Sequence, residues 1–279
     1  MNTITEEVKK YTLNNGTVIT QTQLDHWNKQ LSSLQPQEVL QWAICTFPNL
    51  SQITAFGLSG LVIIDLLHKA QRSVSTEKTQ EKDKLENKQR SIPLIFVDTL
   101  HHFPQTLELL QKIEAKYYSP YEEKIFIYQP QGCTSEIQFA EKYGDFLWEK
   151  DDDHYDYLVK VEPLNRAYKD LQIDCVFTGR RKSQGGLRGS MPIVEIDEIN
   201  NVVKINPLRD WEFKDVKKYI DDHKVPFNEL LDLGYKSIGD YHSTVPTGAN
   251  GDERGGRWNG TVKTECGIHD PKRFLKYMK

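Results

Sequence analysis

A cysteine near the carboxyl end of the chain has the residue surroundings of a nucleophile. Cys266 lies in the sequence ECGIH, after a stretch rich in glycine. Basic side chains are close to it in the sequence: Arg254, Arg257, Lys263 and His269. Cationic surroundings lower the pKa of a thiol and create a nucleophile, whereas the adjacent Glu265 acts in the opposite direction. The sequence therefore predicts a candidate nucleophile and leaves the sign of the net pKa shift open, with a buried structural cysteine as the alternative.

A basic loop over residues 178–188 is the best candidate for binding an anion. It contains four basic residues and three glycines in a chain that is otherwise slightly acidic. Guanidinium groups bind phosphate oxygens in a bidentate manner, and glycines let backbone amides approach them. We expect Arg180 and Arg181 to bind phosphate because the loop follows a predicted strand; the alternative is a solvated basic turn.

Two further loops follow predicted strands. The sequence AFGLSG at 55–60 offers backbone N–H groups to a phosphate, although turn geometry explains its glycines equally well. In the next loop, Asp98 and Thr99 could hold a ribose or a base edge, or could simply satisfy the turn. His101 and His102 lack a third ligand, so we favour a structural role over metal binding.

The composition is that of an ordinary globular protein. The chain has 279 residues, with 36 Lys plus Arg, 40 Asp plus Glu and a net charge of −4, which argues against sequence-independent binding of nucleic acid. Its longest apolar run, 61–67, is interrupted by Asp65, so we expect no membrane-spanning segment. The amino terminus lacks the features of a secretory or organelle signal, and we expect a cytoplasmic protein. The four cysteines, at 45, 133, 175 and 266, contain no close pair, and we expect free thiols.

Short apolar strands alternate with helical segments, which predicts a doubly wound, mostly parallel α/β sheet. The predicted strands cover residues 53–56, 92–97, 125–128 and 176–178. The predicted helices cover residues 61–70, 104–117, 135–143 and 163–171. In such a sheet the ligand site lies at the carboxyl ends of the strands, where the three loops are.

We expect three parts in the chain. Residues 1–50 form an N-terminal helical region, with a helix over 22–47 that Pro36 divides. Residues 51–238 form the nucleotide-binding α/β domain, which ends with a hairpin of 193–196 and 202–205 and helices at 211–223 and 227–233. Within it, residues 71–91 are a charged insertion too poor in large apolar residues to be well ordered. Residues 239–279 form a mobile C-terminal segment that carries the nucleophile.

Six sequence segments together resemble the phosphoadenylyl-sulfate (PAPS) reductases, especially those of fungi. They are VDTLHHFPQT, TGRRKSQG, INPLRDW, LLDLGYKSIGDYHST, ERGGRW and ECGIH, and the likeness runs from about Ile53 to the carboxyl end. The resemblance implies an adenine nucleotide α-hydrolase-like fold with a flexible C-terminal arm, and a homodimer. It also implies reduction of PAPS to sulfite and adenosine 3′,5′-bisphosphate in sulfate assimilation, with thioredoxin as electron donor.

The resemblance also implies roles for individual residues. Cys266 attacks the sulfur of the sulfate group and carries an S-sulfocysteine, from which thioredoxin releases sulfite, and His269 is a second catalytic residue. The loops and the resemblance together give a set of substrate-binding residues: Gly57, Leu58, Ser59, Gly60, Asp98, Thr99, Lys160, Gly179, Arg180, Arg181, Gln184, Arg254 and Arg257. A solvated surface position is the alternative for Lys160.

No cofactor is expected. The relative that reduces the substrate without a 3′-phosphate holds an iron–sulfur cluster with two pairs of cysteines. In this chain the place that matches the first pair is Tyr155-Asp156, and the place that matches the second pair is Asp240 to Ser243. Neither place contains a cysteine. This favours PAPS and a single-thiol mechanism. Two other classes stay open: an adenylyl- or pyrophosphate-transferring enzyme on the same sheet, and a non-catalytic nucleotide-sensing module.

Overall fold

A six-stranded sheet forms the centre of the molecule. The computed structural model describes residues 8–76, 92–248, 251–258, 263, 265 and 267–278. The strand order is β5-β4-β3-β6-β8-β7. The strands are β3 (Leu50–Thr54), β4 (Leu94–Val97), β5 (Phe126–Tyr128), β6 (Cys175–Phe177), β7 (Val194–Asp197) and β8 (Val202–Ile205). Neighbouring strands pair in parallel except for the antiparallel hairpin of β7 and β8, which confirms the predicted doubly wound α/β fold.

Helices surround this sheet. In the described part of the chain the α-helices are α1 (Gln21–Leu31), α2 (Pro36–Thr46), α3 (Leu58–Thr76), α4 (Pro104–Ile113), α5 (Glu136–Tyr143), α6 (Leu147–Lys150), α7 (Asp152–Asp156), α8 (Glu162–Asp170) and α9 (Phe213–His223). Pro36 begins α2, at the place where the sequence predicts that the proline divides the first helical region, and the Ser135 hydroxyl accepts a hydrogen bond from the Gln138 amide at the start of α5. None of the helices in these ranges has the length and apolarity needed to cross a membrane.

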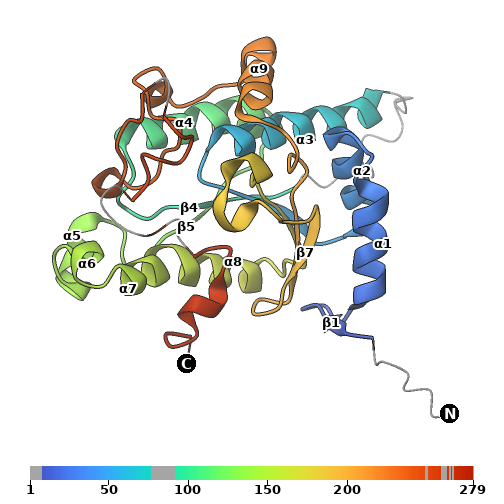
Figure 1. Cartoon of the computed structure of the whole chain (residues 1–279). Coiled ribbons are helices and arrows are strands. Elements are labelled where there is room, and N and C mark those ends of the chain that lie inside the picture. The colour runs from blue at the N-terminus through green and yellow to red at the C-terminus, as the bar shows by residue number, and fades with distance from the viewer. Residues whose placement is uncertain are drawn as a thin grey trace.

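The central strands β3, β4 and β6 are buried on both faces because helices cover both faces of the sheet. Ile53, Ile95 and Val176 pack with Leu164 of α8. The alternate residues of the same strands, such as Phe96, join a larger core that includes residues of α1 to α4 and α9. Figure 1 shows α8 on one side of the strands and α3, α4 and α9 on the other.

The structure differs from the predicted elements at several places. A small hairpin of β1 (Lys10–Thr12) and β2 (Val18–Thr20) precedes α1, and α6 and α7 are additional helices. Strand β3 ends at Thr54 because Phe56 adopts a φ of 56°, which a strand does not permit. Helix α3 continues to Thr76, so the first six residues of the predicted charged insertion are helical; residues 77–91 lie outside the described residues.

Residues of the predicted N-terminal and C-terminal parts contribute to buried packing. Leu24 and Leu40 belong to the same core as the strands of the sheet. Trp258 and Phe274, near the carboxyl end, are also buried. The division of the chain into three parts stays a prediction.

Candidate active site

The chain changes direction within the sheet between β3 and β6. It runs from β3 through β4 to β5 at one edge, and then returns to place β6 on the other side of β3. The loops that follow β3 and β6 therefore leave neighbouring strands and diverge, which creates the crevice where doubly wound sheets bind ligands. A cavity of about 230 Å³ lies at this place.

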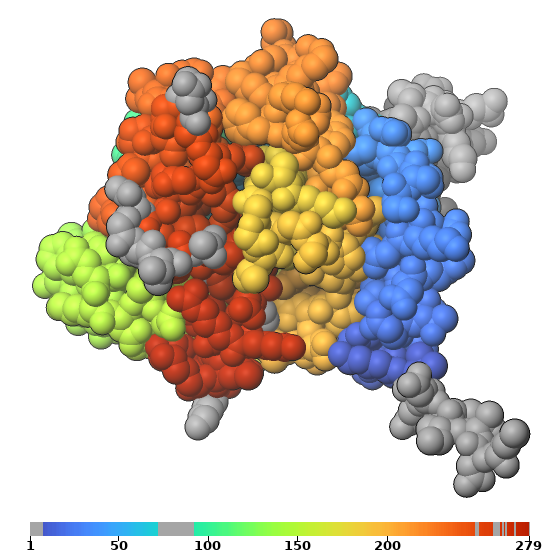
Figure 2. Space-filling view, viewed as in Figure 1, coloured from blue at the N-terminus to red at the C-terminus, as the bar shows by residue number. Residues whose placement is uncertain are grey.

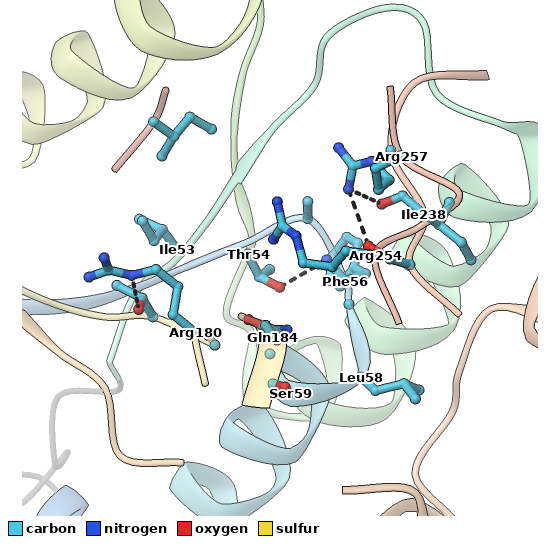
Figure 3. A pocket seen from close by; sticks show the side chains of 18 of the residues that line it. Ile53, Thr54, Phe56, Leu58, Ser59, Arg180, Gln184, Ile238, Arg254 and Arg257 are labelled. Atoms are coloured by element: carbon cyan, nitrogen blue, oxygen red, sulfur yellow. Dashed lines mark hydrogen bonds between the residues drawn. The ribbon is translucent and has the colours of Figure 1, made fainter. Parts of the chain in front are cut away.

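Most of the residues predicted to bind substrate line this cavity. They are Gly57, Leu58, Ser59, Gly60, Thr99, Lys160, Gly179, Arg180, Gln184, Arg254 and Arg257, and the predicted catalytic His269 is among the lining residues too. Figure 3 shows Arg180, Arg254 and Arg257 around the cavity, with Ser59 at the start of α3. The fold thus brings together residues from five distant parts of the sequence.

The loop after β3 is shaped by its close approach to the loop after β6. A Cβ at Gly179 would lie 2.9 Å from the amide nitrogen of Gly60, and a Cβ at Gly60 would lie 2.5 Å from Thr54 Oγ1. The absence of a Cβ at Gly179 therefore lets the loop after β6 approach Gly60, and its absence at Gly60 lets the start of α3 pack against Thr54 of β3. Gly57 has open space around it, and α3 begins beside the cavity at Leu58, where the first N–H groups of a helix have no partner within the helix.

Arg180 presents a buried positive charge to the cavity. Its Nε donates a hydrogen bond to Thr178 Oγ1 at 3.2 Å, and its guanidinium pairs with Glu195 of β7. Burial, followed by the charge of Arg188, lowers the pKa of Arg180 to about 10. Arg180 therefore keeps its charge at neutral pH.

Arg181, in contrast, does not line the cavity. Its side chain is 1% exposed and donates to Ser59 Oγ (2.8 Å), to Ser183 Oγ (2.9 Å) and to the carboxylate of Glu253. It ties the loop after β6 to the start of α3 and to the C-terminal segment. Of the two arginines expected to contact phosphate, only Arg180 faces the cavity.

The C-terminal segment brings two more arginines to the cavity. The guanidinium carbons of Arg254 and Arg257 lie 5.2 and 4.6 Å from the ring centroid of Trp258. Arg257 also donates to the carbonyl of Ile238 at 3.2 Å, and Arg254 donates to the carboxylate of Glu265 at 3.1 Å. Figure 2 shows the C-terminal residues, in red, packed beside the yellow residues that follow β6.

Lys160 is buried at the cavity wall between two carboxylates. Its Nζ donates to Asp156 Oδ1 at 2.8 Å and to Asp240 Oδ2 at 2.6 Å, and Thr99 Oγ1 donates to Asp240 Oδ1 at 2.7 Å. Burial alone would raise the pKa of Asp240, but the charge of Lys160, with smaller contributions from nearby histidines, holds it well below its usual range. Lys160 is therefore not the solvated surface residue that the sequence left as an alternative.

Asp98 and Thr99 occupy different positions, although they are adjacent in the sequence. Thr99 lines the cavity, whereas Asp98 does not. Asp98 Oδ1 accepts from the amide of Leu100, whose φ is 68°, and Oδ2 accepts from Gln129 Nε2, both at 2.9 Å. These bonds match the turn-stabilising role that was weighed for Asp98. His101 also has a structural partner, since its Nδ1 lies 2.8 Å from the Thr99 carbonyl oxygen.

His269 faces the cavity as a neutral side chain. Its Nδ1 is buried without a hydrogen-bond partner. Burial, with the charges of Arg180 and Lys204 among others, holds the pKa of His269 well below its usual value. The imidazole is therefore uncharged at neutral pH, which corrects the expectation that His269 adds to the cationic surroundings of Cys266.

Lys263 also adds less net positive charge than its sequence position suggests. It is largely buried and pairs with Asp152, at 2.6 Å, and with Asp156. Cys266 itself lies outside the described residues. Ile268, from the same ECGIH sequence, lines the cavity.

The cavity wall has an excess of positive charge. The described residues that line it include six basic ones: Lys160, Arg180, Arg188, Lys236, Arg254 and Arg257. Asp240 and Glu253 are the acidic residues among them. Such a wall attracts a ligand that carries several negative charges.

Comparisons with known proteins identify the family. Residues 49–246 match the phosphoadenosine phosphosulfate reductase domain. The chain is 58% identical over 273 residues to the phosphoadenosine phosphosulfate reductase of Saccharomyces cerevisiae, covering 98% of this chain and 99% of that protein. This chain belongs to the phosphoadenosine phosphosulfate reductase family. It is therefore an oxidoreductase that acts on a sulfur group, and the recognised resemblance is confirmed.

Two further family members are informative. The crystal structure of PAPS reductase from Candida auris in a phosphate complex has a TM-score of 0.68 and 52% identity, and covers 81% of this chain and 98% of that chain. The adenosine 5′-phosphosulfate reductase of Halalkalibacterium halodurans is 33% identical over 250 residues, covering 89% of this chain and 97% of that protein. The family thus includes proteins named for substrates with and without the 3′-phosphate.

The places that match the cluster cysteines of related reductases lie close together in this chain. The Tyr155 hydroxyl and His242 Nε2 are 3.0 Å apart, and Asp156 and Asp240 share the ammonium group of Lys160. An ion pair and an aromatic contact therefore join the two segments. Among the described residues, no group of three or more His, Cys, Asp or Glu side chains could hold a metal ion.

Three lining residues of chemical interest, Arg188, Lys236 and Trp258, were not among the predicted site residues. Arg188 belongs to the basic loop, but nothing in the sequence distinguishes it from a solvated base. Lys236 and Trp258 lie in segments without regular periodicity, and tertiary contacts bring them to the cavity.

Of the other cysteines, Cys133 and Cys175 are buried and Cys45 is exposed, and all three are free. Burial raises the pKa of Cys175 well above its usual value, which makes this thiol a poor nucleophile.

Proposed function

We propose that this chain reduces 3′-phosphoadenylyl sulfate to sulfite and adenosine 3′,5′-bisphosphate, with reduced thioredoxin as the electron donor and Cys266 as the nucleophile. The observation that carries this proposal is the basic cavity at the crevice between β3 and β6, in a chain of the phosphoadenosine phosphosulfate reductase family. A nucleotide with a 3′-phosphate and a 5′-phosphosulfate has the negative charge that such a cavity favours.

The proposed chemistry has two transfers at one sulfur atom. The thiolate of Cys266 attacks the sulfur of the phosphosulfate, the bond from that sulfur to the phosphate oxygen breaks, and adenosine 3′,5′-bisphosphate leaves. A thioredoxin thiolate then attacks Sγ of Cys266, and sulfite leaves with the bonding electron pair. The second thioredoxin thiol resolves the mixed disulfide. The thioredoxin dithiol supplies two electrons, and Cys266 returns to its thiol form.

The cationic side chains explain how an anionic nucleophile approaches an anionic substrate. Arg180, Arg188, Arg254 and Arg257 line the cavity and would offset the charge that accumulates as the thiolate meets the sulfate group. His269 carries no charge at neutral pH, so we propose that it contributes through its unpartnered Nδ1 rather than as a cation. Asp98 and Arg181 act as positioning residues through the contacts described above.

We propose PAPS rather than the nucleotide without a 3′-phosphate as the substrate. The reductase of Saccharomyces cerevisiae, at 58% identity, is named for the 3′-phosphorylated substrate, and that of Halalkalibacterium halodurans, at 33%, is named for the other. The absence of cysteine at residues 155, 156, 240 and 243 supports the same choice and a mechanism without an iron–sulfur cluster.

We also propose that the chain is a cytoplasmic homodimer that binds neither nucleic acid nor membranes. In this proposal the C-terminal segment 239–279 presents Cys266 first to the nucleotide and then to thioredoxin. One sulfur atom meets a small ligand and then a protein-sized partner, which gives the segment a reason to move. Light scattering of the purified chain tests the dimer, since a monomeric mass would contradict it.

Turnover of the wild-type chain and of Cys266→Ser tests the function. Wild type is expected to form sulfite from PAPS and reduced thioredoxin, whereas Cys266→Ser is expected to bind adenosine 3′,5′-bisphosphate and form no sulfite. Sulfite formation by the variant would reject the covalent mechanism. ATP consumption by the wild type would favour the adenylyl-transferring alternative, and binding without any turnover would favour the nucleotide-sensing one.

A further inference from the structure

The carboxylate of Glu265 sits between two arginines in the manner of a bound anion. Its Oε1 accepts from Arg188 Nε at 2.6 Å and its Oε2 from Arg188 Nη2 at 2.9 Å, so the guanidinium binds it through two parallel hydrogen bonds. Arg254 Nη2 donates to Oε2 at 3.1 Å. This geometry, with a planar fork on one side and a second guanidinium on the other, is the one that recognises phosphate and sulfate oxygens.

All three side chains are largely removed from solvent. The exposed fractions are 11% for Arg188, 13% for Arg254 and 15% for Glu265. Burial alone would raise the pKa of Glu265, but its hydrogen bond to Arg188 and the charges of Arg188, Arg254 and Arg180 outweigh burial and lower it. Glu265 is therefore ionised at neutral pH and supplies the negative charge that these arginines need.

The position of the cluster relates it to ligand binding. Arg188 and Arg254 line the cavity, whereas Glu265 does not appear among its lining residues. The two arginines thus face the cavity and the carboxylate at once. An oxyanion in the cavity would therefore meet two guanidinium groups that already donate to Glu265.

We propose that Arg188 and Arg254 form an oxyanion subsite for a phosphate or sulfate group of the substrate, and that the carboxylate of Glu265 occupies this subsite in the ligand-free chain as an internal competitor. The choice of nucleotide rests on the proposed function; the competition itself rests on the three side chains. Binding of the substrate anion then releases Glu265 from both arginines.

Glu253 provides an internal comparison. It is another carboxylate of the C-terminal segment that pairs with an arginine, but its partner Arg181 does not line the cavity. Glu253 also accepts from Gln184 Nε2 at 3.0 Å. Glu253 itself lines the cavity, so Glu253→Gln removes a negative charge from the cavity wall without freeing Arg188 or Arg254, and it is the control for the effect of charge alone.

Isothermal titration calorimetry with adenosine 3′,5′-bisphosphate tests the inference. Glu265→Gln is expected to bind this nucleotide about tenfold more tightly than wild type, because the charged competitor of the bidentate site is gone. Glu253→Gln is expected to show a smaller change. In the Arg188→Ala background the gain from Glu265→Gln is expected to shrink, because only Arg254 is then contested by the carboxylate.

Unchanged or weaker binding by Glu265→Gln of both adenosine 3′,5′-bisphosphate and adenosine 5′-phosphosulfate would overturn the proposal, since it would make Glu265 an anchor rather than a competitor. A gain that persists in full without Arg188 would also overturn it. If Glu265→Gln does not fold, Glu265→Asp serves instead: its shorter side chain reaches the arginines less well, so a moderate gain supports the proposal and a loss contradicts it.

A second probe locates the competing group on the nucleotide. Adenosine 5′-phosphosulfate has the sulfate but no 3′-phosphate, and adenosine 3′,5′-bisphosphate has the reverse. A gain confined to either probe supports the subsite and identifies its group, and equal gains point to the shared 5′-phosphate. Because these are binding measurements, failure of the wild type to reduce PAPS would reject the proposed function and leave the competition by Glu265 intact.

Discussion

At the scale of single residues, the charges of the site are set by buried partners. Lys160 is held by Asp156 and Asp240, which are themselves buried. Removing one partner of a buried pair leaves a poorly compensated charge, whereas removing one partner of an exposed pair costs little. The buried and exposed ion pairs of this chain should therefore respond very differently to the same substitution.

Asp240→Asn tests this contrast. We expect it to lower the free energy of unfolding by about 3 kcal/mol, because Lys160 loses one of its two carboxylates in a buried site. Asp222→Asn removes the partner of Lys218 on the exposed face of α9 and should leave stability nearly unchanged. Urea denaturation of both variants measures the difference, and equal midpoints would contradict the role given to Asp240.

The types of residue in the loops that follow strands predicted much of the candidate site. They did not predict which side chains face the cavity. Gly57 to Gly60 and Arg180 line the cavity because each follows a strand of a parallel sheet, which is a local rule. Arg181 and Asp98 followed the same rule and yet bond to the protein itself. The neutral state of His269 depends on burial and on charges from distant segments, which no local sequence pattern reports.

At the scale of elements, the site depends on how closely the loops after β3 and β6 approach each other. Their glycines remove side chains at the contact, so the loop after β6 rests against the start of α3. The alternation of apolar strands with helices predicted this arrangement. The hairpin of β1 and β2 and helices α6 and α7 were missed because their short segments have too little periodicity to be recognised.

Gly179→Ala is expected to separate the two loops. Its Cβ would lie 2.9 Å from the backbone nitrogen of Gly60, which cannot move without displacing α3. We expect a loss of about 2 kcal/mol in unfolding free energy and weaker binding of adenosine 3′,5′-bisphosphate. Gly57→Ala, which has open space, is the control for folding. Thermal unfolding and calorimetry check both, and a Gly179→Ala protein as stable as Gly57→Ala would contradict the close contact.

At the scale of the whole molecule, the buried histidines make stability depend on pH in a defined window. Burial, partly offset by Asp240, lowers the pKa of His242 from 6.5 to about 4, and the pKa of His269 is lowered as well. A histidine with a depressed folded pKa binds protons more readily in the unfolded chain. The contribution of these histidines to the free energy of unfolding is therefore fully present above pH 6.5 and is lost as the pH falls toward 4.

The variant His242→Gln should reduce this pH dependence. We expect the slope of unfolding free energy against pH between 6.5 and 4 to be shallower than in wild type, because one group no longer takes up a proton on unfolding. The buried carboxylates Asp65, Asp197 and Asp240 have lowered pKa values, so their contribution is lost at more acidic pH, below the window of the histidines. Urea titrations at a series of pH values measure the slope, and an unaltered slope would contradict the assignment.

The spectrum of the purified chain tests the proposed absence of a cluster. Residues 155, 156, 240 and 243 offer no thiolate to iron. We expect a colourless protein whose sulfite production is unaffected by a chelator. A broad visible absorption that bleaches on reduction would contradict both the cofactor-free mechanism and the preference for PAPS.

The covalent step at Cys266 is the centre of the account, and mass spectrometry tests it most directly. The purified chain is mixed with PAPS without any reductant, digested and mapped. We predict an added SO₃ group on the peptide that contains Cys266, released as sulfite when reduced thioredoxin is supplied. An unmodified Cys266 in a sample that still forms sulfite once thioredoxin is added would contradict the account.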